Sequence, residues 1–105
     1  MTTLPGILIS ERTDAQFAPR YSVILWDSPD HTFDYVIDMM RKVFAMTLAD
    51  AMAIAAIVHT EGRANCGLFG LEEAEVKRDK IHAFGPDSRI DNCAGSMHAT
   101  IEKAD

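Results

Sequence analysis

The feature of this sequence that most constrains its fold is the segment from Val58 to Phe69, where one periodicity replaces another. Before it, apolar residues recur at three- and four-residue steps, the spacing of one helix face: Leu48, Ala51, Ala55 and Val58. Gly62 stands where such a helix would end, because glycine readily adopts the left-handed conformation that closes many helices. The next residues alternate as in a strand with one inward face: Ala64, Cys66 and Leu68.

The remaining pattern predicts four further elements. Residues 21–26 are β-branched and aromatic, which indicates a strand, and residues 27–30 supply turn chemistry. A helix should begin near Phe33, capped by Asp30 or Thr32, and another should cover 71–84. Alternation from Met97 to Ile101 predicts a last strand. The order β-α-α-β-α-β indicates an α+β fold, with three helices packed on one face of a three-stranded antiparallel sheet.

The chain of 105 residues, 48% of them hydrophobic, has enough apolar material for one small domain. Residues 1–20 show no lasting periodicity, so we expect a flexible N-terminal tail, although Ile7 to Ile9 are mildly apolar. Residues 21–105 form the predicted core domain. An active site enclosed between two domains is excluded.

The formal charge of −6 argues against nucleic-acid binding, because no basic stripe exists to neutralise phosphates. The longest apolar run, residues 51–58, is too short to span a membrane. No secretory signal is evident, so we expect a cytoplasmic protein, and a monomer. Cys66 and Cys93 have neither metal-like nor redox-like spacing, and the four histidines have no ligand spacing, so no metal or other cofactor is expected.

A candidate cleft lies between the start of the first helix and the end of the second. Phe33, Val36, Ala55, Val58 and His59 can meet there, with Asp27 and Ser28 arriving from the preceding loop. An apolar cavity with a carboxylate and an imidazole at its rim suits a bulky side chain attached to a free amine. The alternative from the pattern alone is that these are ordinary core residues, with His59 satisfying a helix C-terminus.

Three segments together resemble the ClpS family: Tyr21 to Trp26, Val58 to Phe69 and Thr100 to Ala104. ClpS proteins are ATP-dependent Clp protease adaptors that recognise N-degrons, the N-terminal residues marking proteins for degradation. The resemblance implies a non-enzymatic adaptor that binds a Phe, Tyr, Trp or Leu end, with Ile and Val open. It also implies delivery to a Clp AAA+ unfoldase of the ClpA type.

The resemblance also implies roles for individual residues. His59 would bind the α-amino group, together with Asp27 and Ser28, and Val36 and Val58 would line the hydrophobic pocket. The chain departs from the family at other pocket positions: His31 replaces a threonine, Phe33 and Ala55 replace methionines, and Met97 replaces a leucine. Asp27-Ser28-Pro29 stands where the family typically has Asn-Asp-Asp. Glu72 and Lys77 match charged positions that dock on the unfoldase, which an exposed helix face could equally explain.

Two alternatives remain from the sequence. The changed loop allows a ClpS-like binding module with a different N-terminal residue preference, or one with no role in delivery. More distantly, His59 and Cys66 could form the thiol–imidazole pair of a small cysteine hydrolase. An inward strand position for Cys66 argues against this, because buried thiols are inert.

Overall fold

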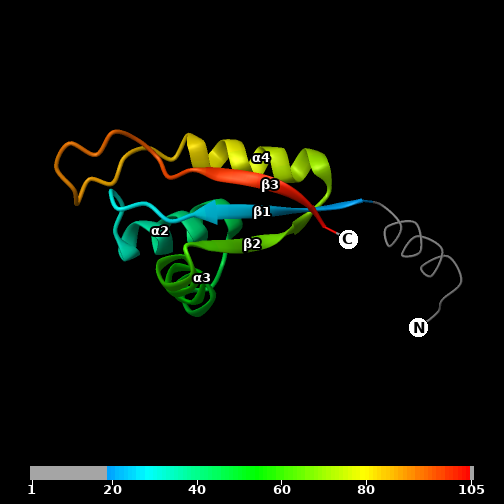
Figure 1. Ribbon diagram of the computed structural model, residues 1–105, viewed down its shortest axis with the longest axis horizontal. Helices are drawn as coiled ribbons and strands as arrows, with labels where there is room; N and C mark the ends of the chain where they lie inside the picture. The colour runs from blue at the N-terminus through cyan, green and yellow to red at the C-terminus, as the bar shows by residue number, and fades with distance from the viewer. Residues whose placement is uncertain (1–18, 105) are drawn as a thin grey trace, which may run out of the picture.

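The computed structural model describes residues 19–104 as three helices packed against one three-stranded antiparallel sheet of order β2-β1-β3 (Figure 1). The elements follow the predicted order: β1 (Arg20–Trp26), α2 (Phe33–Phe44), α3 (Leu48–Glu61), β2 (Arg63–Phe69), α4 (Leu71–His82) and β3 (Ala99–Ala104). The predicted fold class is therefore confirmed. The predicted tail lies outside the described residues except for its last two positions, and Arg20 already belongs to β1.

All three helices cover the same face of the sheet. Val23 and Leu25 of β1 are 0% exposed and share one core with residues of every helix. The opposite face carries polar pairs instead: the Trp26 Nε1–H donates to Thr100 Oγ1 at 2.8 Å, and an Arg63–Glu102 ion pair lies nearby. Ile24 of β1 is also buried, at 2% exposed, on this second face, so the middle of β1 is buried on both faces.

Side chains cap both of the helices that will flank the site. Thr32 Oγ1 accepts a hydrogen bond from the Tyr35 N–H at 3.1 Å, so Thr32 caps α2 and Asp30 does not. Thr47 caps α3 in the same way, as predicted. Gly62 ends α3 with φ of 86°, and its N–H donates to the Val58 carbonyl. The predicted start and end of α3 are confirmed.

The expectation that Leu68 faces inward is wrong. The β1–β2 register shifts between Ser22 and Ile24, and Leu68 pairs with Ser22 on the open face, where it is 49% exposed. Phe69 packs against the core in its place, with its ring 5.9 Å from that of Phe44. Gly67, at φ of 149°, lies in this irregularity. An extra residue in one strand reverses the alternation, which a strict two-residue period does not anticipate.

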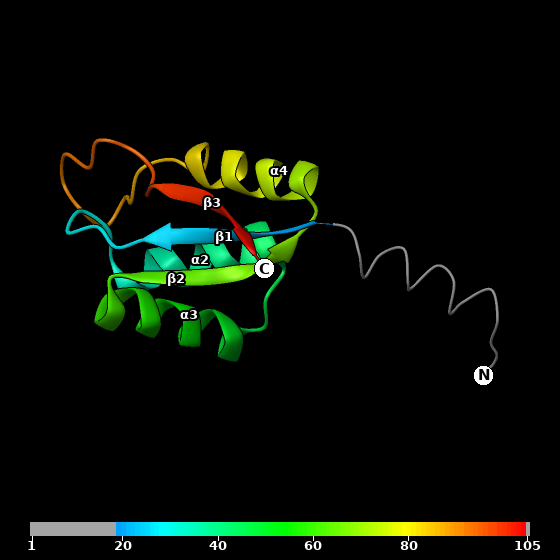
Figure 2. The same ribbon diagram turned by 45° about the vertical axis from the view of Figure 1, so that its right-hand side comes forward.

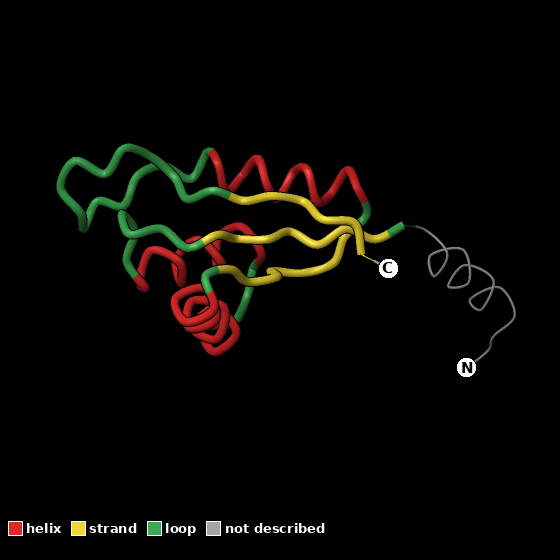
Figure 3. Tube along the Cα trace, viewed as in Figure 1, coloured by secondary structure: helices red, strands yellow, loops and turns green. Residues whose placement is uncertain are grey.

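The connection between α4 and β3 is longer than predicted. α4 ends at His82 rather than Phe84, and β3 begins at Ala99 rather than Met97. The intervening residues 83–98 form the α4–β3 loop, and residues 27–32 form the β1–α2 loop. These two loops lie side by side at the end of the sheet farthest from residues 19 and 104 (Figure 3).

We expect Gly67→Ala to lower the free energy of unfolding by about 1–3 kcal/mol, the usual cost of a residue held in a sparsely populated conformation. An added Cβ would also lie 2.8 Å from Phe69 Cζ. Urea denaturation measures the change. Gly95→Ala is the matched control, because Gly95 has free space around it and alanine there should be neutral or slightly stabilising. If Gly67→Ala and Gly95→Ala changed the free energy of unfolding equally, the strand irregularity at Gly67 would not require glycine.

Candidate functional site

A small pocket lies where the two loops meet the start of α2 and the end of α3 (Figure 2 shows this end of the sheet). Its lining comprises Asp27, His31, Thr32, Phe33, Val36, Ala55, Val58, His59 and Met97. The structure therefore brings together every residue that the sequence placed in the amine site or the hydrophobic pocket, with the exception of Ser28. Thr32 is the lining residue that the sequence did not suggest.

The pocket floor is apolar and buried. Val36 from α2, Ala55 and Val58 from α3, and Met97 from the α4–β3 loop are each 4% exposed or less. Ala55 and Val58 lie on the α3 face that packs against α2, which follows from their three-residue spacing. Val36, Ala55 and Val58 belong to the core as well as to the pocket floor, whereas Phe33 and His59 are exposed at its edge and are not core residues.

The cavity in this state is small, at about 20 Å³, which is space for about one water molecule. Phe33, at the edge of this cavity, is 42% exposed, whereas the floor residues are buried in the core.

The rim of the pocket is polar and open to water. The Asp27 N–H donates to the Gly62 carbonyl at 2.9 Å, which joins the end of β1 to the turn that follows α3. This bond brings the exposed Asp27 side chain to the same pocket edge as His59, on the last turn of α3. One carboxylate and one imidazole thus border an apolar floor.

Ser28 supports the pocket without lining it. Its Oγ lies 2.8 Å from His31 Nδ1, and His31 Nε2 lies 2.6 Å from the Gly95 carbonyl oxygen. A carbonyl only accepts, so Nε2 carries the proton and, in the neutral ring, Nδ1 accepts from the Ser28 hydroxyl. His31 is further packed against Tyr35, with ring centroids 4.6 Å apart. This pocket wall is therefore held on three sides.

The two candidate docking residues lie on α4, and neither lines the pocket. Glu72 is exposed in the first turn. Lys77 is half-buried: its Nζ donates to the Val43 carbonyl at 2.9 Å and lies 5.6 Å from the Phe44 ring centroid. Lys77 thus stabilises the C-terminal end of α2, a structural role that the sequence did not reveal.

Cys66 lies buried on β2 and is absent from the pocket lining. Burial raises the pKa of its thiol to about 12, although a backbone contact with Leu25 opposes the shift. The thiol is therefore protonated at neutral pH and is a poor nucleophile. Across residues 19–104, no three His, Cys, Asp or Glu side chains gather in a way that could hold a metal ion. Over the same range, every helix is too short or too polar to cross a bilayer.

Comparison with known proteins identifies the family. A family profile described as ATP-dependent Clp protease adaptor protein ClpS matches residues 16–89. The ATP-dependent Clp protease adapter protein ClpS of Hydrogenovibrio crunogenus is 31% identical over 78 residues, covering 74% of this chain and 75% of the relative. The chain belongs to the ClpS family.

A solved structure shows the same fold. Agrobacterium tumefaciens ClpS2, determined bound to L-phenylalaninamide, superposes with a TM-score of 0.71 at 19% sequence identity. The match covers 82% of this chain and 98% of that one. The predicted family resemblance and the predicted arrangement of helices on the sheet are confirmed together.

We expect the two cysteines to differ sharply in their reaction with iodoacetamide. Cys93 is half-buried in a loop and should be alkylated in the native protein, whereas Cys66 should react only after unfolding, because its thiol is buried and protonated. Mass spectrometry of digests made with and without urea measures both. Alkylation of native Cys66 at the rate of Cys93 would show that β2 opens at this point.

Proposed function

We propose that this protein is a non-enzymatic adaptor that binds polypeptides through a bulky hydrophobic N-terminal residue and its free α-amino group. It then delivers them to a Clp AAA+ unfoldase–protease. The observation that carries the proposal is the pocket itself, a buried apolar floor bordered by Asp27 and His59. Membership of the ClpS family supports it independently.

The pocket chemistry suits an N-terminal residue because such a residue combines two unlike groups on one carbon atom. The side chain would replace water on the floor, and full burial of a large apolar side chain contributes about 1.5–3 kcal/mol. The ammonium group would donate to the Asp27 carboxylate and to an unprotonated His59 nitrogen, and such charge-assisted bonds are stronger than neutral ones. An internal residue of a polypeptide has no α-ammonium group beside its side chain, so it would leave Asp27 and His59 without this partner.

The size of the cavity indicates how the ligand would enter. A water-sized space must widen, and outward rotation of the exposed Phe33 ring would widen it without disturbing the core. The displaced ring could then meet an aromatic ligand edge-to-face, worth about 0.5–1.5 kcal/mol beyond the buried area. L-phenylalaninamide, the ligand of the structurally similar ClpS2, carries the same combination of phenyl ring and free amine.

Delivery requires a second surface. We assign docking on a ClpA-like unfoldase chiefly to the exposed Glu72, because Lys77 is already committed to the end of α2. The proposal treats residues 21–105 as the adaptor domain, residues 1–20 as a tail, and the protein as a cytoplasmic monomer. It involves no catalysis, which accords with the buried, protonated Cys66.

A second candidate is a ClpS-like module with an altered N-terminal residue preference, with or without delivery. It is favoured by the substitutions in the lining, since His31 and Phe33 are bulkier than the family's usual residues and Ala55 is smaller. Peptide titrations across different first residues distinguish this candidate from the first.

Peptides that differ only in their first residue test the binding proposal. A peptide beginning with Phe should bind, the same peptide beginning with Ala should bind at least about tenfold more weakly, and N-acetylation should abolish most of the affinity. Isothermal titration calorimetry measures all three. Equal affinity for the free and acetylated peptides would remove the basis of the proposal.

Ala55→Met tests the floor. The longer side chain should fill the cavity, so binding of a Trp-initiated peptide should weaken more than binding of a Leu-initiated one, by about tenfold in the ratio. Ala56→Met on the exposed side of the same helix is the control and should leave the ratio unchanged. An unchanged Trp-to-Leu ratio in Ala55→Met would show that Ala55 does not contact the ligand.

A further inference from the structure

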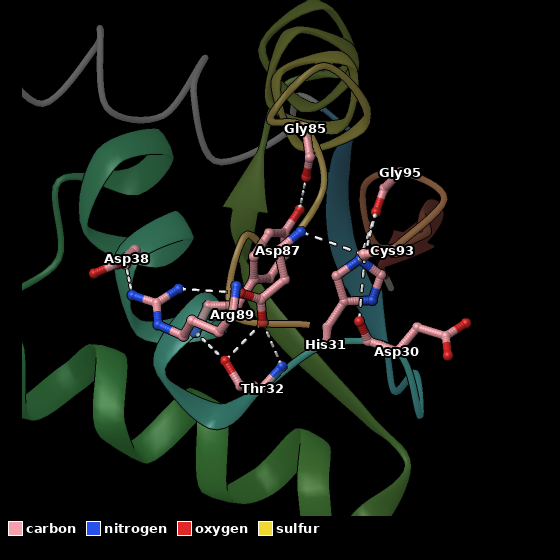
Figure 4. Close-up of polar contacts among 10 residues, drawn as sticks. Asp30, His31, Thr32, Asp38, Gly85, Asp87, Arg89, Cys93 and Gly95 are labelled. Carbon is pink, nitrogen blue, oxygen red and sulfur yellow. Dashed lines mark hydrogen bonds and ion pairs between the residues drawn. The ribbon is translucent and has the colours of Figure 1, made fainter. Parts of the chain in front are cut away.

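The α4–β3 loop contains Asp87, the only charged side chain that is buried among residues 19–104, at 1% exposed. Its two oxygens each accept two hydrogen bonds (Figure 4). Oδ2 accepts from the N–H and the hydroxyl of Thr32, at 2.8 and 2.7 Å. Oδ1 accepts from the N–H and the Nη1 of Arg89, at 3.0 and 3.2 Å. Burial of a carboxylate is costly unless both of its oxygens accept hydrogen bonds, so the donors on Thr32 and Arg89 must keep fixed positions.

The carboxylate is charged under ordinary conditions. Burial by itself raises the pKa of Asp87, but the hydrogen bonds from Thr32 and Arg89 outweigh it and hold the pKa well below its usual range. Charge-assisted bonds to Thr32 therefore persist at neutral pH.

Thr32 connects this carboxylate to the pocket. Its hydroxyl donates to Asp87 and accepts from the Tyr35 N–H at 3.1 Å, so both the side chain and the start of α2 are fixed. Thr32 lines the pocket, and its two neighbours in the chain, His31 and Phe33, form the adjacent wall. A displacement of Thr32 would move that wall relative to α3.

The same loop holds the wall at a second point and contributes to the floor. The Gly95 carbonyl binds His31 Nε2, and Cys93 Sγ lies 3.6 Å from the same nitrogen. Cys93 Sγ also accepts from the Asp87 N–H at 3.3 Å, which links the two points of attachment. Met97, near the end of the loop, is 2% exposed on the pocket floor.

We propose that Asp87 is a positioning residue for the N-terminal-residue pocket: through Thr32 it fixes the distance between the wall formed by His31 and Phe33 and the wall formed by α3. The α4–β3 loop thereby determines which side chains fit. The inference rests on the proposed function and deepens it. The family profile ends at residue 89, so residues 90–98 lie outside the stretch matched to the family.

Asp87→Asn tests the proposal, because a carboxamide has one oxygen and cannot accept from both Thr32 and Arg89. We expect about a tenfold loss of affinity for a Phe-initiated peptide and a Phe-to-Ala affinity ratio closer to one. Hydrogen exchange at the Thr32 amide, now bonded to Asp87 Oδ2, should accelerate. Both are measured at a temperature at which each variant is folded.

Two controls separate positioning from stability. Asp38 also binds Arg89, at 2.7 Å to Nη2, but its side chain is 46% exposed, and the hydrogen bonds of Thr32 go to Asp87 and Tyr35 instead. Asp38→Asn should therefore change the peptide affinity by no more than about twofold. Val43→Ala removes buried volume from the last turn of α2, at the far end from the pocket, and should lower stability while leaving the affinity ratio intact.

The outcomes are distinct. If Asp87→Asn keeps the wild-type Phe-to-Ala ratio, or if Val43→Ala narrows the ratio equally, Asp87 has only a structural role and the inference is overturned. If the wild-type protein binds neither free peptide, the proposed function fails instead, and the pocket-positioning role fails with it. If Asp87→Asn does not fold, Arg89→Gln is the substitute variant, because it removes the Nη donors to Asp87. It should bring the Phe-to-Ala affinity ratio closer to one, by a smaller factor than Asp87→Asn. An unchanged Phe-to-Ala affinity ratio in Arg89→Gln overturns the inference.

Discussion

The turn at Gly62 is the constraint on which the site depends. α3 ends at Glu61 and β2 begins at Arg63, so a single residue reverses the chain from helix to strand. Its φ of 86° is a conformation that glycine adopts without the steric cost of a Cβ. The Gly62 carbonyl also accepts the Asp27 N–H. The last turn of α3 and the end of β1 must therefore meet, and a carboxylate and an imidazole are placed at one edge.

The floor and the outer wall of the pocket are held in place by different interactions. Its floor comes from α2, α3 and Met97 of the α4–β3 loop, and it is fixed by core packing, which tolerates little change in volume. Its outer wall comes chiefly from the β1–α2 loop, where the Ser28 hydroxyl contacts His31, the Gly95 carbonyl accepts from His31, and the Asp87 carboxylate accepts from Thr32. Phe33 belongs to a helix but lies at its exposed first position, so it is the part of the wall with the fewest constraints.

The regular elements and the floor could be predicted because they depend on local chemistry. Thr47, Gly62 and the β-branched run of β1 each act within a few residues, and the spacing of Ala55, Val58 and His59 fixes their common location on α3. In α3, which is apolar on all sides, the spacing of apolar residues does not identify the buried face reliably. Leu48, which this spacing places on the packed face, is 49% exposed. Leu68 was misplaced because a bulge depends on the fit between two strands, which one strand's sequence does not encode.

Asp87 shows why the remainder of the site was beyond prediction. In the sequence it belongs to Gly85-Pro86-Asp87-Ser88, a run that predicts only a helix end, and its partner Thr32 lies 55 positions away. A buried carboxylate has no periodic signature, because its burial is compensated by specific donors rather than by a pattern of apolar neighbours. Loops joined by such contacts can change their sequence while the core remains intact. If Asp87 has the positioning role proposed above, substitutions in the α4–β3 loop would alter which N-terminal side chains fit the pocket without any change in the helices and strands.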